Sequence, residues 1–329
     1  SHSSVCFSQQ IVRWLWIISE VSLFLNFADY VKSISSPDIE MEQITPHVYS
    51  FPGIRGCDPS MVLTSQGAVF IDTAQWITQL EQMIDFAKEK CGGVKYVINT
   101  ESHIDHVFGN PYLKREGATI ISHEKMVDGY YKIPPAFNQT TYEYNLDLLK
   151  RQDPTQVAKL LPEGEEEIGK PDITFSDRMT LKLGDHTFQI FHTPGHSPEQ
   201  SSVYVPQERC VFVGDNIFNA CQIWLHSVDF DALFHSLDWL QSLDVDYIIP
   251  GHGPVKGKEC IVENKQFLYA WLAAVGEGIE KGWSKEECVE RISFADRCLM
   301  DIGQPECMEY VQTNNVRKCY DYLMRKAEL

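Results

Sequence analysis

A run of six residues carries four side chains that can bind metal ions. The run is Glu101-Ser102-His103-Ile104-Asp105-His106, and it directly follows the apolar segment 94–99. Glu101 and His103 project to the same side if the backbone stays extended, while Asp105 and His106 turn toward a second position. One ion does not normally need four ligands from six residues, so the run predicts two ions. A solvated polar loop with two incidental histidines is the alternative for this run taken alone.

Three later segments place further metal-binding side chains at the ends of predicted strands. They are His192-Thr193-Pro194-Gly195-His196-Ser197, Val213-Gly214-Asp215-Asn216 and Ile249-Pro250-Gly251-His252-Gly253. Glycine beside a candidate ligand lets the backbone approach a crowded centre without a side-chain clash. Ligands of α/β sheets gather at the carboxyl ends of strands. Four strand ends that each deliver His or Asp therefore predict a shared metal centre.

Together these motifs resemble the pattern of the metallo-β-lactamase superfamily. That pattern is His-x-His-x-Asp-His, then a Pro-Gly-His turn, then Gly-Asp, then Gly-His-Gly, and the resemblance covers roughly residues 42–256. It implies an α/β fold, the four-layered αββα sandwich, to which this chain adds a helical C-terminal extension. It also implies an enzyme, a hydrolase that depends on two divalent metal ions.

The resemblance, carried over residue by residue, implies a role for each motif side chain. One ion would be bound by Glu101, His103 and His196, and the second by Asp105, His106 and His252, with Asp215 bridging both. Asp72, at the end of a predicted strand, matches the aspartate that supports the metal loop in the family. His192 matches no ligand position, and we expect it to orient a neighbour or to pack in the core.

Glu101 stands where the common family pattern has histidine. Some members of the lactamase group, mostly in its third subclass, carry Gln or Glu here, whereas flavodiiron proteins place Glu at the second position, where this chain has His103. A carboxylate reduces the positive charge at the first ion, so that ion should be a weaker Lewis acid. A hard oxygen ligand also tolerates iron or manganese better than a third imidazole would. Zinc is the expected metal, with Fe or Mn as alternatives.

The expected reaction is hydrolysis of a carbonyl–heteroatom bond in an ester, thioester, lactone or β-lactam. A metal-bound hydroxide held between the two ions would attack the carbonyl while one ion polarises its oxygen, and Asp105 would orient that hydroxide or take its proton. Covalent catalysis is disfavoured, because no Gly-x-Ser-x-Gly elbow is present and no cysteine adjoins a motif histidine. A true metallo-β-lactamase acting on antibiotics and an iron-dependent redox enzyme on the same fold are the alternatives.

Aromatic residues are the candidates for binding the substrate. Trp76, together with Tyr130 and Tyr131 in a tyrosine-rich stretch, could form an apolar wall around an acyl group. The alternative is that these aromatics only pack the irregular insertion at residues 124–170.

Short strand patterns and helical spacing indicate the elements that must position these side chains. Strands are predicted at 48–51, 61–64, 68–71, 94–99, 118–122, 173–175, 179–183, 186–192, 202–205, 210–213 and 247–249, and a helix at 76–90. The chain is expected to be helical from residue 258, with Ser284 and Glu287 as a capping box. The order of elements predicts helices packed on a mixed sheet. We therefore expect a catalytic domain at 41–257 and a helical extension at 258–329 packed on it.

The composition favours a small-molecule substrate over nucleic acid. The 329 residues include 46 acidic and 28 basic ones, which gives a net charge of −18. A duplex-binding surface needs clustered Lys and Arg to displace counterions from phosphates, and no such run occurs. The ten scattered cysteines, without a Cys-x-x-Cys pair, are expected to be reduced.

Residues 1–40 are expected to form an apolar helical segment. Its stretch 11–31 is interrupted by Arg13, Glu20 and Asp29, too many charges for a spanning helix. No clean signal peptide is visible, which favours a cytoplasmic location. We expect an amphipathic helix packed on the domain or on a partner subunit, which leaves a homodimer open. Contact with a membrane surface and a leader remnant are the less favoured alternatives.

Overall fold

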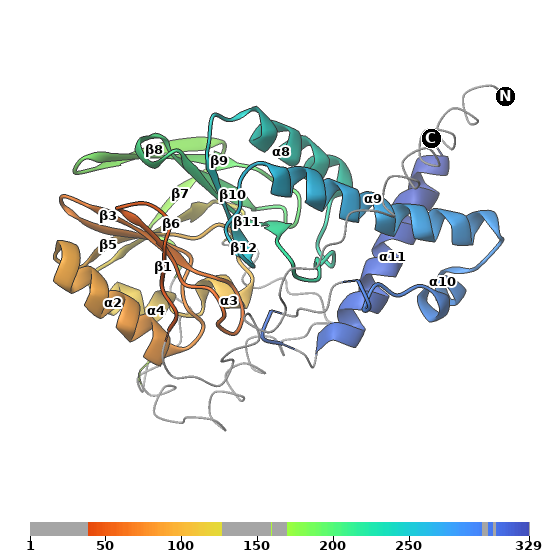
Figure 1. Ribbon diagram of the computed structural model, residues 1–329, viewed down its shortest axis with the longest axis horizontal. Helices are drawn as coiled ribbons and strands as arrows, with labels where there is room; N and C mark the ends of the chain where they lie inside the picture. The colour runs from red at the N-terminus through yellow and green to blue at the C-terminus, as the bar shows by residue number, and fades with distance from the viewer. Residues whose placement is uncertain (1–38, 127–158, 160–169, 298–301, 305–306, 329) are drawn as a thin grey trace.

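The computed structural model describes residues 39–126, 159, 170–297, 302–304 and 307–328. The N-terminal helical segment predicted at 1–40, except its last two residues, lies outside these described residues, and so do Tyr130 and Tyr131. The described part of the chain folds into two β-sheets with helices on their outer faces (Figure 1).

The first sheet has seven strands in sequential order. They are β1 (Glu42–Gln43), β2 (Val48–Ser50), β3 (Ser60–Thr64), β4 (Gly67–Ile71), β5 (Val94–Ile98), β6 (Thr119–His123) and β7 (Ile173–Phe175). β1 to β4 form an antiparallel meander, and β4 to β7 run parallel to one another, so the sheet is mixed as predicted. The helix α2 (Ile77–Cys91) makes the crossover from β4 to β5 that parallel neighbours require. The ends of β4 and β5 are in register, with Ile71 opposite Ile98.

The second sheet has five strands in the order β12-β11-β10-β9-β8. They are β8 (Arg178–Leu183), β9 (His186–His192), β10 (Ser201–Val205), β11 (Cys210–Phe218) and β12 (Tyr247–His252). β8 to β11 pair antiparallel, and β11 pairs parallel with β12.

The predicted end of β12 at Ile249 is wrong, because that strand runs to His252. The predicted end of β11 at Val213 is also wrong. The strand continues to Phe218 through register shifts on either side of Gly214, whose φ is 51°. Such an irregularity re-aims side chains while the strand keeps its pairing with β12. Asp215 therefore lies inside an irregular strand and not after the end of a regular one.

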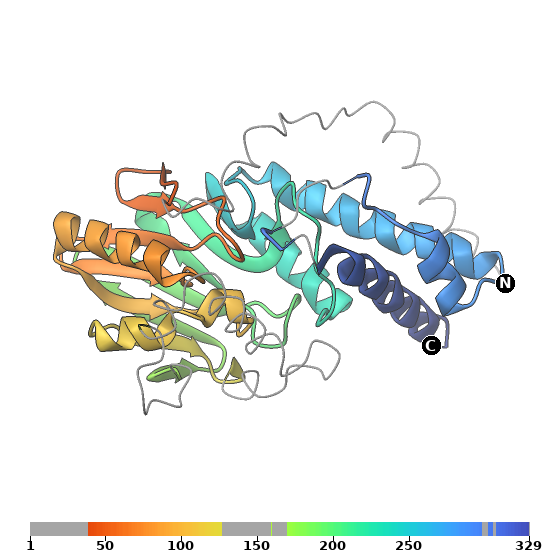
Figure 2. The ribbon, with the colours of Figure 1, turned by 90° about the horizontal axis from the view of Figure 1, so that it is seen from below.

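Helices cover the outer face of each sheet and complete four layers (Figures 1 and 2). α2 and α4 (Asn110–Arg115) pack on the first sheet, whereas α8 (Phe230–Ser242) and α9 (Glu259–Glu280) pack on β11 of the second. The short helices are α3 (Ile104–Val107), within the six-residue run, and η2 (Pro206–Glu208), between β10 and β11. The predicted αββα sandwich is confirmed.

The C-terminal helices share a core with the second sheet. α10 (Lys285–Arg291) and α11 (Met308–Ala327) pack against α9. One continuous cluster of buried apolar side chains runs from Val211 in β11 through Leu240 in α8 and Trp271 in α9 to Val316 in α11. A second cluster lies between the two sheets and a third lies beneath α2. The predicted helical extension thus forms part of the outer layer over the second sheet.

One local expectation about the C-terminal region is also met. Ser284 Oγ accepts a hydrogen bond from the Glu287 N–H at 3.2 Å, and Glu287 Oε2 accepts from the Ser284 N–H at 2.8 Å, which is the predicted capping box. No disulfide joins any of the cysteines within the described residues to one another.

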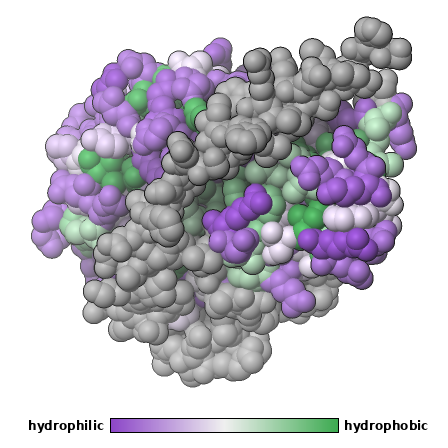
Figure 3. All heavy atoms as spheres, turned by 45° about the vertical axis from the view of Figure 1, so that its right-hand side comes forward, coloured by the Kyte–Doolittle hydropathy of each residue, from purple (hydrophilic) through white to green (hydrophobic). Residues whose placement is uncertain are grey.

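Hydrophilic side chains dominate the described part of the face in Figure 3, with hydrophobic ones gathered in patches between them. This distribution agrees with the net charge of −18. None of the helices in the described ranges is long and apolar enough to cross a membrane.

Replacing Trp271 by alanine should lower the free energy of unfolding by about 3–5 kcal/mol, because it opens a large cavity in the core shared by the second sheet and the C-terminal helices. Trp271 is fully buried and stacks on Phe294 with ring centroids 4.0 Å apart. Urea unfolding followed by circular dichroism measures the change. Val262→Ala, on the exposed face of the same helix, is the control and should change stability by less than about 0.5 kcal/mol. Equal effects of the two changes would contradict a shared core.

Candidate metal centre

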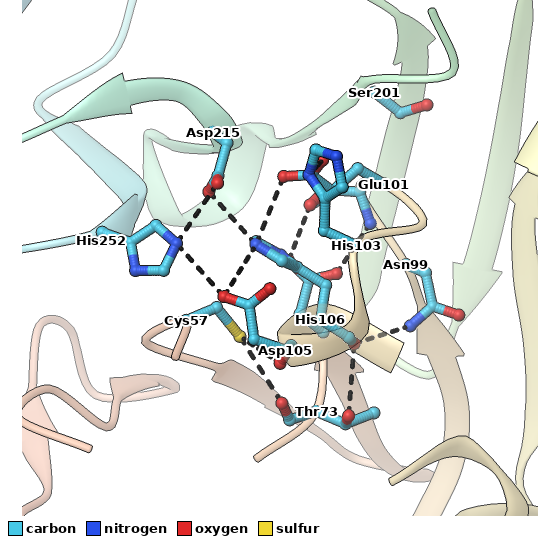
Figure 4. Close-up of polar contacts among 12 residues, drawn as sticks. Cys57, Thr73, Asn99, Glu101, His103, Asp105, His106, Ser201, Asp215 and His252 are labelled. Atoms are coloured by element: carbon cyan, nitrogen blue, oxygen red, sulfur yellow. Dashed lines mark hydrogen bonds and ion pairs between the residues drawn. The ribbon is translucent and has the colours of Figure 1, made fainter. Parts of the chain in front are cut away.

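The seven predicted ligands come from both sheets and lie together in two adjoining groups. Figure 4 shows six of them, namely Glu101, His103, Asp105, His106, Asp215 and His252. The run after β5 begins with extended backbone, and His103 still has φ −61° and ψ 145°. Asp105 and His106 lie in the single turn of α3. The change from extended to helical backbone aims the Glu101–His103 pair and the Asp105–His106 pair at different points, as their spacing predicted.

The first group of ligand atoms surrounds Glu101. One donor atom each of Glu101, His103, His196 and Asp215 lies within 4.8 Å of all the others. Glu101 Oε2 lies 2.5 Å from His103 Nδ1 and 3.7 Å from His196 Nε2. His196 Nε2 also lies 3.2 Å from His103 Nδ1. Atoms at these separations can share a single ion.

The second group consists of Asp105, His106 and His252. His252 Nε2 lies 3.4 Å from Asp105 Oδ2, and His106 Nε2 lies 3.8 Å from the same oxygen. Asp215 stands between the two groups. Its Oδ1 is 3.2 Å from His106 Nε2, and its Oδ2 is 3.2 Å from His252 Nε2 and 3.6 Å from His196 Nε2. This is the position of a carboxylate that can bridge two ions.

The buried ligand atoms of these two groups do not satisfy one another by hydrogen bonds, and metal ions would satisfy them. Both oxygens of Glu101, Nε2 of His106 and of His252, and Oδ1 of Asp215 are buried without a well-formed hydrogen bond. Burial raises the pKa of Glu101 to about 7, although His103 opposes the shift. A further positive charge is therefore needed to keep this carboxylate fully ionised at neutral pH. The donor set is the one that divalent metal ions bind.

The histidine His196 is already in the form that binds a metal. Burial lowers the pKa of its imidazole to about 3, despite the opposing charge of Asp215. The ring is neutral at physiological pH, and a neutral imidazole offers a lone pair to an ion without first losing a proton.

Asp72 fixes the orientation of His106 and of the loop after β5. Its Oδ1 accepts a hydrogen bond from the Thr100 N–H at 2.8 Å, and its Oδ2 accepts one from the Thr100 hydroxyl at 2.7 Å. Its Oδ2 also lies 3.0 Å from His106 Nδ1. When Nδ1 donates to Asp72, Nε2 keeps its lone pair toward the centre. Asp72 has a positive φ of 61°, a strained conformation that three contacts hold in place.

Two glycines allow the backbone to pass close to the centre. A Cβ added at Gly251 would lie 2.0 Å from Asp215 Oδ1. A Cβ added at Gly253, which has a positive φ of 92°, would lie 1.8 Å from the carbonyl oxygen of Asn219. Neither position has room for a larger residue, which explains why glycine flanks His252 on both sides.

The loop between β2 and β3 holds the centre together from the first sheet. The Asp58 N–H donates to the Gly251 carbonyl at 2.7 Å, and Asp58 Oδ2 accepts from the Gly253 N–H at 2.7 Å. Cys57 Sγ donates to the carbonyl of Asp105 at 3.1 Å. Burial raises the pKa of the Cys57 thiol well above its usual range, so the sulfur remains a hydrogen-bond donor. Both ends of the His252 turn and the backbone of Asp105 are thereby fixed.

The remaining predicted residues have different positions. His192 donates from Nε2 to the carbonyl of Pro198 at 2.8 Å and stacks on His123 with ring centroids 3.9 Å apart. It thus supports the turn that carries His196, in keeping with the orienting role expected for it. Trp76 is half-buried against the core beneath α2. Its contact with a substrate stays a prediction.

His226 lies at this centre although no motif indicated it. It belongs to the segment between β11 and α8, and its Nε2 lies 3.0 Å from His103 Nε2. Together with His103 and His196 it forms a further group of atoms close enough to hold an ion. Burial lowers the pKa of His226 well below its ordinary value, so its ring is neutral. The segment has no family motif, and only the folded chain brings it to residue 103.

Glu199 is a second residue that the motifs did not indicate. Its Oε1 accepts from the backbone N–H of Ser102 at 3.3 Å and from the Ser102 hydroxyl. These bonds join the loop after β5 to the turn after β9, so they set the distance between the first two ligands and His196. Glu199 is buried, but nothing in the sequence distinguishes it from other carboxylates near the motifs.

Comparison with known proteins identifies the family. The model of the metallo-beta-lactamase superfamily matches residues 55–252, more than half of the chain. The chain belongs to the metallo-beta-lactamase superfamily. The family and fold predicted from the motifs are confirmed.

Similar curated proteins carry the name hydroxyacylglutathione hydrolase. The one from Francisella tularensis subsp. novicida (strain U112) is 35% identical over 91 residues, which are 27% of this chain and 36% of that protein. The one from Pelagibacter ubique (strain HTCC1062) is 25% identical over 210 residues, which are 62% of this chain and 72% of that protein. The chain thus spans little more than a third of the Francisella protein. These relatives are hydrolases by name, which is the enzyme class that the motifs predicted.

Solved structures of similar fold are metallo-beta-lactamases. The one from Pontibacter korlensis has a TM-score of 0.53 at 20% identity and covers 70% of this chain and 99% of that chain. The DIM-1 metallo-beta-lactamase has a TM-score of 0.52 at 16% identity and covers 70% of this chain and 96% of that chain. At these identities the likeness shows the fold alone.

Asp72→Asn should lower the affinity for metal ions about 10–100-fold, because the amide nitrogen cannot accept the hydrogen bonds that the second carboxylate oxygen accepts. Asparagine tolerates a positive φ, so the variant should fold. Competition with a chelating dye measures the affinity. The control is Asp238→Asn, whose side chain is exposed on α8. Wild-type affinity in Asp72→Asn would show that Asp72 does not position a ligand.

Proposed function

We propose that this protein is a dinuclear metal-dependent hydrolase that cleaves thioesters, within a wider class of carbonyl–heteroatom substrates that includes esters, lactones and β-lactams. The observation that carries the proposal is the position of Asp215 between two groups of ligands. Its carboxylate lies 3.6 Å from His196 on one side and 3.2 Å from His252 on the other. A carboxylate at this position can be shared by two ions, whereas a single ion would leave one of the two groups of ligands unused.

The thioester substrate is supported by the names of the curated relatives. A hydroxyacylglutathione is a thioester of glutathione, and the longer match to such a hydrolase spans 62% of this chain. Leaving-group chemistry agrees. A thiol has a pKa of about 8.5, so a thiolate can leave without prior protonation, whereas the amide nitrogen of a β-lactam needs a proton. A thioester therefore demands less general-acid assistance from the site.

The ions would act as Lewis acids toward the carbonyl oxygen and toward water. Asp105 is buried within the second group, with Oδ2 3.4 Å from His252 Nε2. From there it can orient an attacking water and accept its proton. Glu101 and Asp215 are also buried. Their surroundings exclude bulk water, which strengthens every charge interaction at the reacting carbonyl.

Zinc is the proposed metal at both positions, with iron or manganese as alternatives at the first. His103 and His196 give that position the imidazole nitrogens that suit zinc. Glu101 adds a hard oxygen donor that also suits iron and manganese. The alternative function of an iron-dependent redox enzyme rests on this one substitution.

A panel of substrates tests the proposed reaction. The zinc-loaded protein should hydrolyse an S-(2-hydroxyacyl)glutathione with a higher kcat/KM than a p-nitrophenyl ester, a lactone or nitrocefin. The change in absorbance of each substrate or of its product measures the rates. Protein stripped of metal with a chelator is the control. Fastest cleavage of nitrocefin would favour a true β-lactamase. An iron-loaded centre that reacts with oxygen, without hydrolysis, would contradict the hydrolase.

Asp105→Asn should lower kcat for the thioester at least about 100-fold, because the amide keeps the shape of the side chain but cannot accept a proton. The rates are measured at saturating zinc, with the zinc content determined on the same samples, so that loss of an ion is separated from loss of the proton acceptor. Asp238→Asn is again the matched control. Retained activity in Asp105→Asn would exclude the role assigned to this carboxylate.

A further inference from the structure

A separate cluster of metal-binding side chains lies at the opposite end of the sandwich from the candidate metal centre. It consists of His47, His186 and Glu208, and one donor atom of each lies within 4.8 Å of the other two. His47 Nδ1 lies 2.8 Å and His186 Nε2 lies 2.9 Å from the same atom, Oε1 of Glu208. β9 begins at His186, and its other end leads to His196. The length of a strand therefore separates the two groups.

The ring of His186 faces a carboxylate on each side. Its Nδ1 lies 2.9 Å from Asp185 Oδ1, its Nε2 lies 2.9 Å from Glu208 Oε1, and the ring is 3% exposed. A neutral imidazole has a single N–H. When Nδ1 donates to Asp185, the lone pair of Nε2 points at a carboxylate oxygen. Two acceptors then face each other, an arrangement that is stable only with a cation between or beside them.

Glu208 presents a single oxygen to the two rings. The Thr45 hydroxyl donates to Oε2, and this hydroxyl oxygen in turn accepts from the backbone N–H groups of His47 and Val48 at 3.3 and 3.1 Å. Oε1 is left to His47 and His186. The Glu208 side chain is 7% exposed and that of His47 is 45% exposed. The group is thus buried on the side of Glu208 and open to water on the side of His47.

We propose that His47, His186 and Glu208 bind a Zn²⁺ ion. Two imidazoles and one carboxylate are a donor set that zinc takes, and water can supply a fourth ligand from the open side. Hydrogen bonds from a protonated His186 and from Nδ1–H of His47 could also satisfy Glu208, but only a divalent ion accepts lone pairs from all three donor atoms. Asp185 stands behind His186 as carboxylates commonly stand behind zinc-binding histidines, and the Ser65 N–H holds it at 2.9 Å.

The ion would join the two sheets. His47 lies in the turn between β1 and β2 of the first sheet, whereas His186 begins β9 and Glu208 ends η2 in the second. At the catalytic end the sheets are joined through the predicted ligands of the first centre. The proposed zinc supplies a corresponding link at the far end, and its role is structural.

The zinc count of the full chain tests the proposal. Protein stripped with a chelator is reloaded with Zn²⁺, passed through gel filtration and submitted to elemental analysis. His47→Ala should retain one zinc equivalent fewer than the wild type. Because this side chain is half-exposed, the variant should fold. Zn²⁺ should also raise its thermal midpoint less than that of the wild type, since it has lost one stabilising ion. Its hydrolytic activity should be unchanged.

Two further variants test whether the change in zinc count is specific to the proposed site. Glu208→Gln keeps an acceptor for the Thr45 hydroxyl but removes the charge, and it should lose the same equivalent. His235→Ala removes an exposed histidine on α8 and should keep the wild-type count. Equal zinc counts in the wild type, His47→Ala and Glu208→Gln would overturn the proposal and leave a hydrogen-bonded cluster. Because the readout is a difference in zinc count, it can fail while the proposed hydrolysis stands.

Discussion

Three buried carboxylates around the ring of His106, each within 3.8 Å of its Nε2, are the constraint on which this structure depends. Glu101, Asp105 and Asp215 are each less than a tenth exposed, and four imidazoles fill the space between them. Burying one carboxylate without a partner costs several kcal/mol, so three in one place require compensating positive charge. Two divalent ions would provide it. Because the ligands come from both sheets, the free energy of metal binding would also stabilise the closed sandwich.

Several unusual backbone features of the described residues lie close to this centre. Asp72 has a left-handed conformation, β11 is irregular at Gly214, and Gly251 approaches Asp215 at a distance no larger residue could adopt. Each of these costs stability when taken alone. Each also turns a side chain inward, or makes room for one, at the point where the ligands must converge. The regular parts of both sheets provide the core that offsets this strain.

The first ion position differs from the common family pattern in a way the structure helps to explain. Glu101 removes an imidazole from that position, but His226 brings another ring to His103 from a distant segment. More imidazole nitrogens therefore lie near His103 than the motif alone indicates. A carboxylate and an additional imidazole in one place would make this group of ligands the more adaptable of the two toward different metals.

Much of the fold could be predicted from the sequence because its signals are local. Alternation of apolar residues and Gly or Pro punctuation gave strands such as His186–His192 at the bounds that the structure has. Others, such as β3 and β10, differ by a single residue. The exceptions are β11 and β12, which run past their predicted ends at Val213 and Ile249. In β11 the glycine that reads as a strand end is instead an irregularity inside a longer strand. A glycine has the same local pattern in both cases, and only pairing with β12 distinguishes them.

The sequence by itself determined the family, the sandwich and the identity of the seven ligand candidates, since each ligand sits in a short motif beside its own strand. The tertiary structure decided which residues from distant segments contact these ligands and their loops. Glu199 meets Ser102 across 97 residues, and His226 meets His103 across 123. His47 meets Glu208 across 161 residues. Such contacts leave no periodic or spacing signal, because they depend on how two sheets close on each other and not on the residues next to them in the chain.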